Sequence, residues 1–127
     1  MTEIEIDVFE KVQTQLQGMY EEISLLSKKS QNDGLSLFKL KFINKILTDS
    51  NSVLNSKYKP FEDFEIFDEN NIPTNSDVVM ILTQYINCFE KLRADNVVMG
   101  SAGWWYWKIN DEKSDIKTKA PKKIREK

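Results

Sequence analysis

Apolar positions recur at helical spacing near the start of the chain. Between residues 3 and 29, apolar side chains follow one another at intervals of three or four positions: Phe9, Val12, Leu16, Met19, Ile23 and Leu26. This spacing places them on one face of an α-helix. Thr2 and Glu5 have the spacing of a capping box, in which the hydroxyl and the carboxylate bond free backbone amides at a helix start. The pattern therefore predicts a helix over 3–29, ending before Gly34.

Two further segments, 35–56 and 76–96, have the same period. In the second helix the apolar positions cover a wide arc, which is typical of a helix lying between neighbours. In the third, Val78, Leu82, Tyr85, Phe89 and Leu92 form one stripe. We predict a mainly α fold, a small bundle of three helices or of four elements around one core. The residues predicted to be buried are Phe9, Leu16, Ile23, Phe42, Ile46, Leu82, Tyr85 and Phe89.

Residues 57–74 break the helical period and alternate aromatic with acidic side chains. Phe61, Phe64 and Phe67 lie among carboxylates in this segment, which is bounded by prolines. A loop of this length is uncommon in a small domain unless it packs or functions. We expect its aromatic rings to pack on the helices and its carboxylates to face solvent. The acidic stretch 62–69 lacks the glycine and the ligand spacing of a calcium-binding loop, so no metal site is predicted there.

A short aromatic strand is predicted over 104–109. Alternation places Trp104, Tyr106 and Lys108 on one face and Trp105, Trp107 and Ile109 on the other. Both faces are large and apolar, and three helices can easily cover only one of them. The tryptophans therefore either complete the core or anchor a partner, as aromatic residues often do at interfaces. The residues predicted to bind a partner are Trp104, Trp105, Tyr106, Trp107 and Lys108.

Charge divides the chain unevenly. Residues 1–116 carry a net charge of −7, and residues 117–127 carry +5. We predict one helical domain over 1–109 and a basic flexible tail over 110–127, with a turn at 110–112. The tail is either a solvated terminus or a nucleic-acid contact, although the acidic body would repel a polyanion. Its candidate contacts are Lys117, Lys119, Lys122, Lys123 and Arg125.

The chain lacks the side chains that most catalytic mechanisms use. It contains no histidine and one cysteine, Cys88, so neither a histidine-assisted nucleophile nor a zinc site is predicted. Its four glycines are scattered and form no phosphate-binding loop. An acidic N-terminus and the lack of a long apolar run favour a cytoplasmic protein without membrane contact. We predict no enzymatic activity and no cofactor.

These observations favour a binding function. We expect a non-catalytic module, a small adaptor or accessory subunit of a cytosolic protein assembly. Its partner would be another protein or a second copy of itself. The alternative is a nucleic-acid-binding accessory protein that uses residues 104–127, with aromatic rings stacking on bases and lysines following phosphates.

Overall fold

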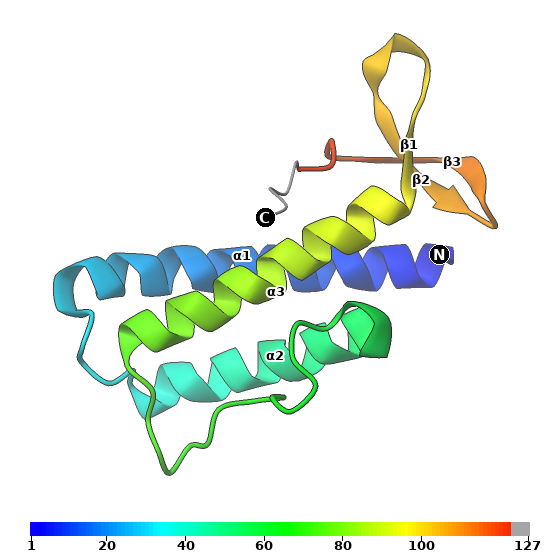
Figure 1. Cartoon of the computed structure of the whole chain (residues 1–127). Helices are drawn as coiled ribbons and strands as arrows, with labels where there is room; N and C mark the ends of the chain where they lie inside the picture. Colours follow the sequence, from blue (N-terminus) through cyan, green and yellow to red (C-terminus); the bar gives the residue numbers. More distant parts are fainter. Residues whose placement is uncertain (123–127) are drawn as a thin grey trace.

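The computed structural model describes residues 1–122. Three helices pack together: α1 (Glu3–Ser30), α2 (Leu37–Tyr58) and α3 (Asn75–Asp95). A small three-stranded antiparallel sheet follows them and stands at the end of the bundle where α1 begins and α3 ends (Figure 1). The predicted mainly α fold is confirmed, and each predicted helix boundary is within two residues of the observed one. No helix in the described part of the chain is long and apolar enough to cross a membrane.

Each helix begins at a hydroxyl side chain. The Thr2 hydroxyl accepts a hydrogen bond from the Glu5 amide at 3.1 Å, and the Glu5 carboxylate accepts one from the Thr2 amide at 2.9 Å. This confirms the predicted capping box. Ser36 caps α2 and Thr74 caps α3: each hydroxyl accepts a hydrogen bond from the backbone amide three residues later in the chain. Because a side-chain oxygen replaces water at these free amides, the sequence defines where each helix starts.

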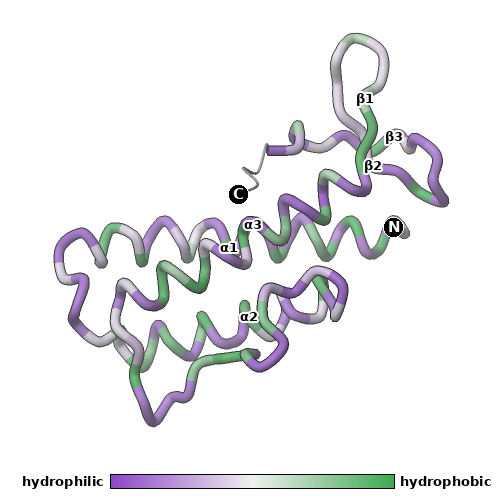
Figure 2. Tube along the Cα trace, in the orientation of Figure 1, coloured by the Kyte–Doolittle hydropathy of each residue, from purple (hydrophilic) through white to green (hydrophobic). Residues whose placement is uncertain are grey.

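The core lies between the three helices, and Figure 2 shows hydrophobic positions recurring along all of them. Seven of the eight residues predicted to be buried are buried. The prediction for Phe42 is wrong, since its side chain is 47% exposed and packs edge-on against Phe38 at 5.1 Å between ring centroids. The wide apolar arc of α2 exceeds what α1 and α3 cover. Its inner side, with Leu40, Ile43 and Leu47, fills the core, and the two phenylalanines remain on the outer side.

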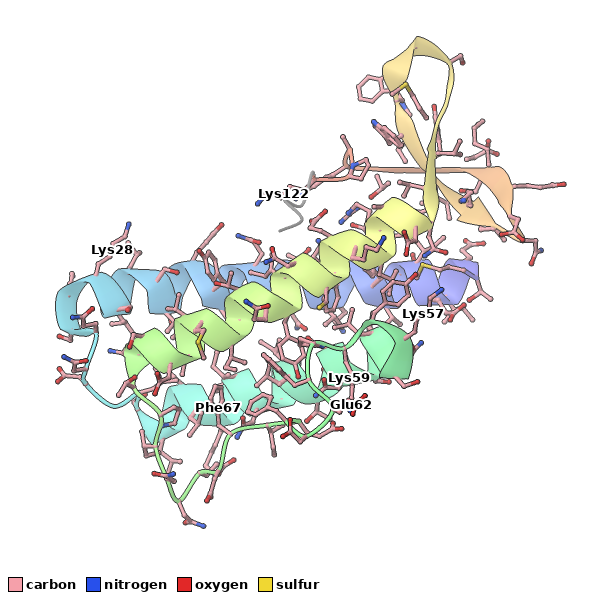
Figure 3. The ribbon with its side chains drawn as sticks, in the orientation of Figure 1. Lys28, Lys57, Lys59, Glu62, Phe67 and Lys122 are labelled. Atoms are coloured by element: carbon pink, nitrogen blue, oxygen red, sulfur yellow. The ribbon has the colours of Figure 1, made fainter. Side chains whose placement is uncertain are left out.

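The segment between α2 and α3 packs as expected. Phe61, Phe64 and Phe67 are partly buried against the core and contact one another edge-on, with centroids 6.1 and 5.2 Å apart. Asn44 of α2 holds Phe67 by two backbone hydrogen bonds, donating to its carbonyl and accepting from its amide, each at 2.9 Å. Phe67 therefore lies beside α2 (Figure 3), while Glu62 and most other carboxylates of this loop are exposed.

The sheet has the order β1 (Val97–Met99), β2 (Trp105–Ile109) and β3 (Glu112–Thr118). A short 3-10 turn, Ser101–Gly103, joins the first two strands. The predicted aromatic strand is β2, beginning one residue later than expected. Strand β1 was not predicted from the sequence.

The sequence analysis predicts a flexible tail over 110–127, and strand β3 corrects this prediction over 112–118, while residues 123–127 lie outside the described residues. Asn110 and Asp111 both have positive φ, 53° and 63°, as the central residues of a two-residue hairpin turn require. Residues 112–118 then pair with β2. Only Ile116 is apolar in this strand, so its charged residues resemble a tail in composition although they alternate as in a strand.

Candidate binding surface on the C-terminal sheet

A buried arginine fixes the sheet to the helices. Arg93, near the end of α3, is fully buried. Its guanidinium donates to the Glu10 carboxylate at 3.2 Å and forms further hydrogen bonds to Gln13 of α1 and Thr118 of β3. It also lies 3.6 Å from the Glu90 carboxylate. Ion pairing and hydrogen bonding compensate the cost of removing this charge from water, and they join three elements at one point.

Trp107 of β2 completes this junction. Its side chain is fully buried and meets Phe9 of α1 edge-on, with centroids 5.0 Å apart. The indole nitrogen donates to the Glu10 carboxylate at 3.0 Å, and the Arg93 guanidinium lies over the indole ring at 5.4 Å. The Thr118 hydroxyl donates to the same carboxylate at 3.0 Å. The sheet is therefore held on α1 through both β2 and β3.

The outer side of the sheet combines aromatic rings with lysines. Tyr106 pairs with Lys117 and Lys108 pairs with Lys113 across β2 and β3, so these side chains share one side. The Lys113 ammonium lies 4.1 Å from the centre of the Tyr106 ring, and the Lys117 ammonium lies 4.6 Å from that of Trp104. We call this surface the aromatic–lysine face; it consists of Trp104, Tyr106, Lys108, Lys113 and Lys117.

The ring of Tyr106 lies directly against Gly100. A Cβ added at Gly100 would come within 2.6 Å of a ring carbon. The Gly100 amide donates to the Trp104 carbonyl at 2.7 Å, which closes the loop between β1 and β2. Trp104, at the end of that loop, is 57% exposed. The face is thus a fixed surface with one prominent indole.

The structure separates the five residues predicted to bind a partner. Trp107 is a core residue, and Trp105 is half-buried against the core. Trp104, Tyr106 and Lys108 belong to the aromatic–lysine face. One side of the strand therefore completes the core, and the other side carries Trp104, Tyr106 and Lys108.

The predicted nucleic-acid contacts are also divided. Lys117 lies on the aromatic–lysine face, whereas Lys119 lines an acidic groove with Glu10 and Glu90. Lys122 is exposed and lies beyond β3, at the end away from the β2–β3 turn (Figure 3). Lys123 and Arg125 lie outside the described residues.

Two important residues were missed from the sequence. Lys113 was assigned to the tail, although the turn signal at 110–111 and the alternation after it would place it on a strand beside Lys108. Arg93 gave no signal in its local pattern. The partners of Arg93 on α1 are about eighty positions away in the sequence, so only the folded chain identifies it.

Two titratable side chains of α3, Cys88 and Tyr85, have raised pKa values. Burial raises the pKa of the Cys88 thiol, which lowers the population of the reactive thiolate. Burial also raises the pKa of Tyr85 to about 12, while its hydroxyl donates to Asn51 at 2.7 Å. Within residues 1–122, no three side chains of the metal-binding types gather in one place.

Comparison with protein-family models, with curated proteins and with solved structures found no match to this chain. The fold itself defines a class: three packed helices followed by a three-stranded antiparallel sheet.

Proposed function

We propose that the protein is a non-catalytic binding module, a small accessory subunit of a protein assembly, and that it binds through the aromatic–lysine face. The observation that carries this proposal is the position of Trp104, 57% exposed beside Tyr106 on a sheet fixed by buried Arg93. Tryptophan and tyrosine anchor protein interfaces more often than other residues. A rigid surface of this kind loses little conformational entropy when a partner binds.

The charge of the face indicates the kind of partner. Lys113 and Lys117 each lie over one of the two aromatic rings, and Lys108 pairs with Lys113 across the strands. A protein surface with carboxylates around an apolar pocket would complement them, because opposite potentials speed encounter and fix orientation. The absence of histidine from the sequence and the raised thiol pKa of Cys88 support a role without catalysis.

The test compares the two aromatic rings of the aromatic–lysine face with two exposed rings on α2. Partners captured by the full-length protein from its native extract are identified by mass spectrometry. They are then compared with those captured by Trp104→Ala/Tyr106→Ala. The control is Phe38→Ala/Phe42→Ala, which removes two exposed rings from α2. We expect the sheet variant to lose a specific partner that the helix variant retains. Equal capture by both variants would contradict the proposal.

A second candidate function is the binding of single-stranded nucleic acid. The observation that favours it is the pairing of two rings with two lysines, since base stacking and phosphate contact use this combination. The net charge of −7 over residues 1–116 opposes it. Its test is a mobility-shift titration at two salt concentrations, because phosphate contacts lose affinity steeply as salt rises.

The variants for this titration are point substitutions, because a truncation after Ile109 would remove β3 from the fold. Lys113→Ala/Lys117→Ala should weaken binding and reduce its salt dependence, whereas Lys28→Ala/Lys29→Ala on α1 should leave both unchanged. If the wild-type protein produces no shift at low salt, this candidate is excluded.

A further inference from the structure

Helix α1 has a second regular stripe, on the side opposite to its core residues. Its members follow one another at alternating intervals of four and three residues, and all are exposed: Ile4, Val8, Lys11, Gln15, Gly18, Glu22, Leu25 and Lys29. Ile4, Val8 and Leu25 are 76%, 45% and 62% exposed. Alternating steps of four and three are the spacing of a coiled-coil seam. We call this stripe the outer seam of α1.

The outer seam is complementary to its own reverse. When a second copy of α1 is laid antiparallel with Gln15 opposite Gly18, Val8 meets Leu25 and Lys11 meets Glu22. Each of these contacts occurs twice about a two-fold axis. At the ends, Ile4 meets Lys29, whose aliphatic stem can cover an apolar side chain while its ammonium stays in water. Val8 and Leu25 thus meet as apolar residues, and Lys11 and Glu22 meet as opposite charges.

Gly18 lies at the centre of this arrangement. Glycine in the middle of a helix is unfavourable compared with alanine. A Cβ added at Gly18 would meet no atom within 4 Å, so nothing inside the chain requires a glycine there. In an antiparallel pair, the missing side chain leaves room for Gln15 of the other copy and allows the two backbones to approach closely.

Two surface grooves lie beside the outer seam. One, of about 470 Å³, runs between α1 and α2, and its lining includes Lys11, Gly18, Glu22 and the exposed Phe42. A second, of about 280 Å³, lies further along between the same helices and is lined by Ile4, Val8 and Val53. A helix lying along the outer seam would cover both grooves and the ring of Phe42.

We propose that the outer seam of α1 is the interface of a symmetric homodimer, with two α1 helices packed antiparallel around the contact of Gln15 with Gly18. A two-fold interface needs one surface that matches itself, and the outer seam does so through the contacts of Val8 with Leu25 and of Lys11 with Glu22. This inference goes beyond the proposed function and leaves the aromatic–lysine face free.

The arrangement also has a consequence for binding. The N-terminal end of α1 lies at the sheet, where the Met1 amino group is 3.5 Å from the Lys108 carbonyl. Antiparallel α1 helices would therefore place the two sheets at opposite ends of the dimer. Each dimer would present two aromatic–lysine faces, so that a partner with repeated sites would bind with increased avidity.

The experiment is a charge reversal with rescue, measured on the full-length protein by sedimentation equilibrium over a concentration series. We expect wild-type protein to reach twice the chain mass of 14.9 kDa. Lys11→Glu and Glu22→Lys each turn two attractive contacts into repulsive ones, and each should raise the dimer dissociation constant by about tenfold or more. The double variant Lys11→Glu/Glu22→Lys restores opposite charges and should recover most of the affinity.

Two controls separate the interface from other effects. Glu22 also bonds Lys39 within the chain at 3.0 Å, and this bond is lost equally in Glu22→Lys and in the double variant, so rescue cannot come from it. Glu21→Lys makes the same charge change on an exposed neighbour outside the seam and should leave the mass unchanged.

Three results would overturn the homodimer: a monomeric mass at every concentration, a dimer unaffected by either single reversal, or reversals that the double variant does not rescue. Loss of the dimer in Trp104→Ala/Tyr106→Ala would place the interface on the sheet instead. Unchanged partner capture by Trp104→Ala/Tyr106→Ala, together with an intact dimer, would contradict the proposed function alone.

Discussion

At the scale of single residues, Arg93 is the most unusual feature of the molecule, because it is a charged side chain with no exposed surface. Replacing it with methionine keeps much of its volume but leaves the side-chain oxygens of Gln13 and Thr118 without their donor, and it removes one of the three donors to Glu10. Removing one partner of a buried ion pair costs about 3–5 kcal/mol. We expect Arg93→Met to reduce by about this amount the free energy of unfolding taken from the tryptophan-fluorescence transition in urea, which reports on the sheet.

Lys91 provides the matched control for this substitution. It lies on the same helix and pairs with Asp95 at 3.1 Å, but on the surface. Because exposed ion pairs contribute less than about 1 kcal/mol, Lys91→Met should change the free energy of unfolding only slightly. Equal effects of the two substitutions would mean that the Arg93 contacts do not stabilise the fold.

Tyr85 makes stability depend on alkaline pH. Burial raises the pKa of Tyr85 in the folded protein to about 12, above the value of about 10 in an unfolded chain. The folded state therefore retains a proton that the unfolded state loses, and this contribution to stability is complete below pH 10 and disappears as the pH rises towards 12. Tyr85→Phe should have a smaller decrease in the free energy of unfolding between pH 10 and 12 than wild type, by about 2 kcal/mol.

The comparison of Tyr85→Phe with wild type uses the change in the free energy of unfolding with pH, not its absolute value. The substitution leaves the Asn51 oxygen without its donor, which lowers stability at every pH. Every other pH-dependent contribution to stability is common to both proteins. Parallel curves for wild type and Tyr85→Phe between pH 10 and 12 would show that Tyr85 is not the source.

At the scale of elements, truncated chains test whether strand β3 is part of the stable fold or a free tail. A chain that ends after Ile109 loses all of β3, including the Thr118 hydroxyl that bonds Glu10 and Arg93. A chain that ends after Ala120 retains them. We expect the shorter chain to have a markedly lower melting temperature by circular dichroism and the longer one to match full-length protein. Equal melting of all three would restore the sequence-based prediction of a free tail.

The elements also show how far the sequence alone could lead. The helices were predictable because their apolar period extends over many turns and a hydroxyl residue caps each start. Strand β3 was not predictable, because Ile116 is its single apolar residue and its place in the fold depends on pairing with β2. On the aromatic strand, alternation correctly separated Trp107 from Trp104. It could not decide which side the helices would cover.

At the scale of the whole molecule, the contacts around Glu10 and Arg93 join the helices and the sheet into one unit. Glu10 of α1 accepts from Arg93 of α3, Trp107 of β2 and Thr118 of β3. These contacts join segments about a hundred positions apart in the sequence, so their identification required the three-dimensional arrangement. A sheet held in this way should not separate from the bundle while the helices remain folded.

The distribution of tryptophan allows this coupling to be measured directly. All three tryptophans lie at the sheet, Trp104, Trp105 and Trp107, whereas most of the helical circular dichroism comes from α1, α2 and α3. Urea unfolding followed by tryptophan fluorescence and by ellipticity should therefore give coincident transitions in the wild-type protein. In Arg93→Met the fluorescence transition should occur at lower urea than the ellipticity transition, because the sheet has lost its main attachment. Separate transitions in wild type would show that the sheet unfolds independently of the helices.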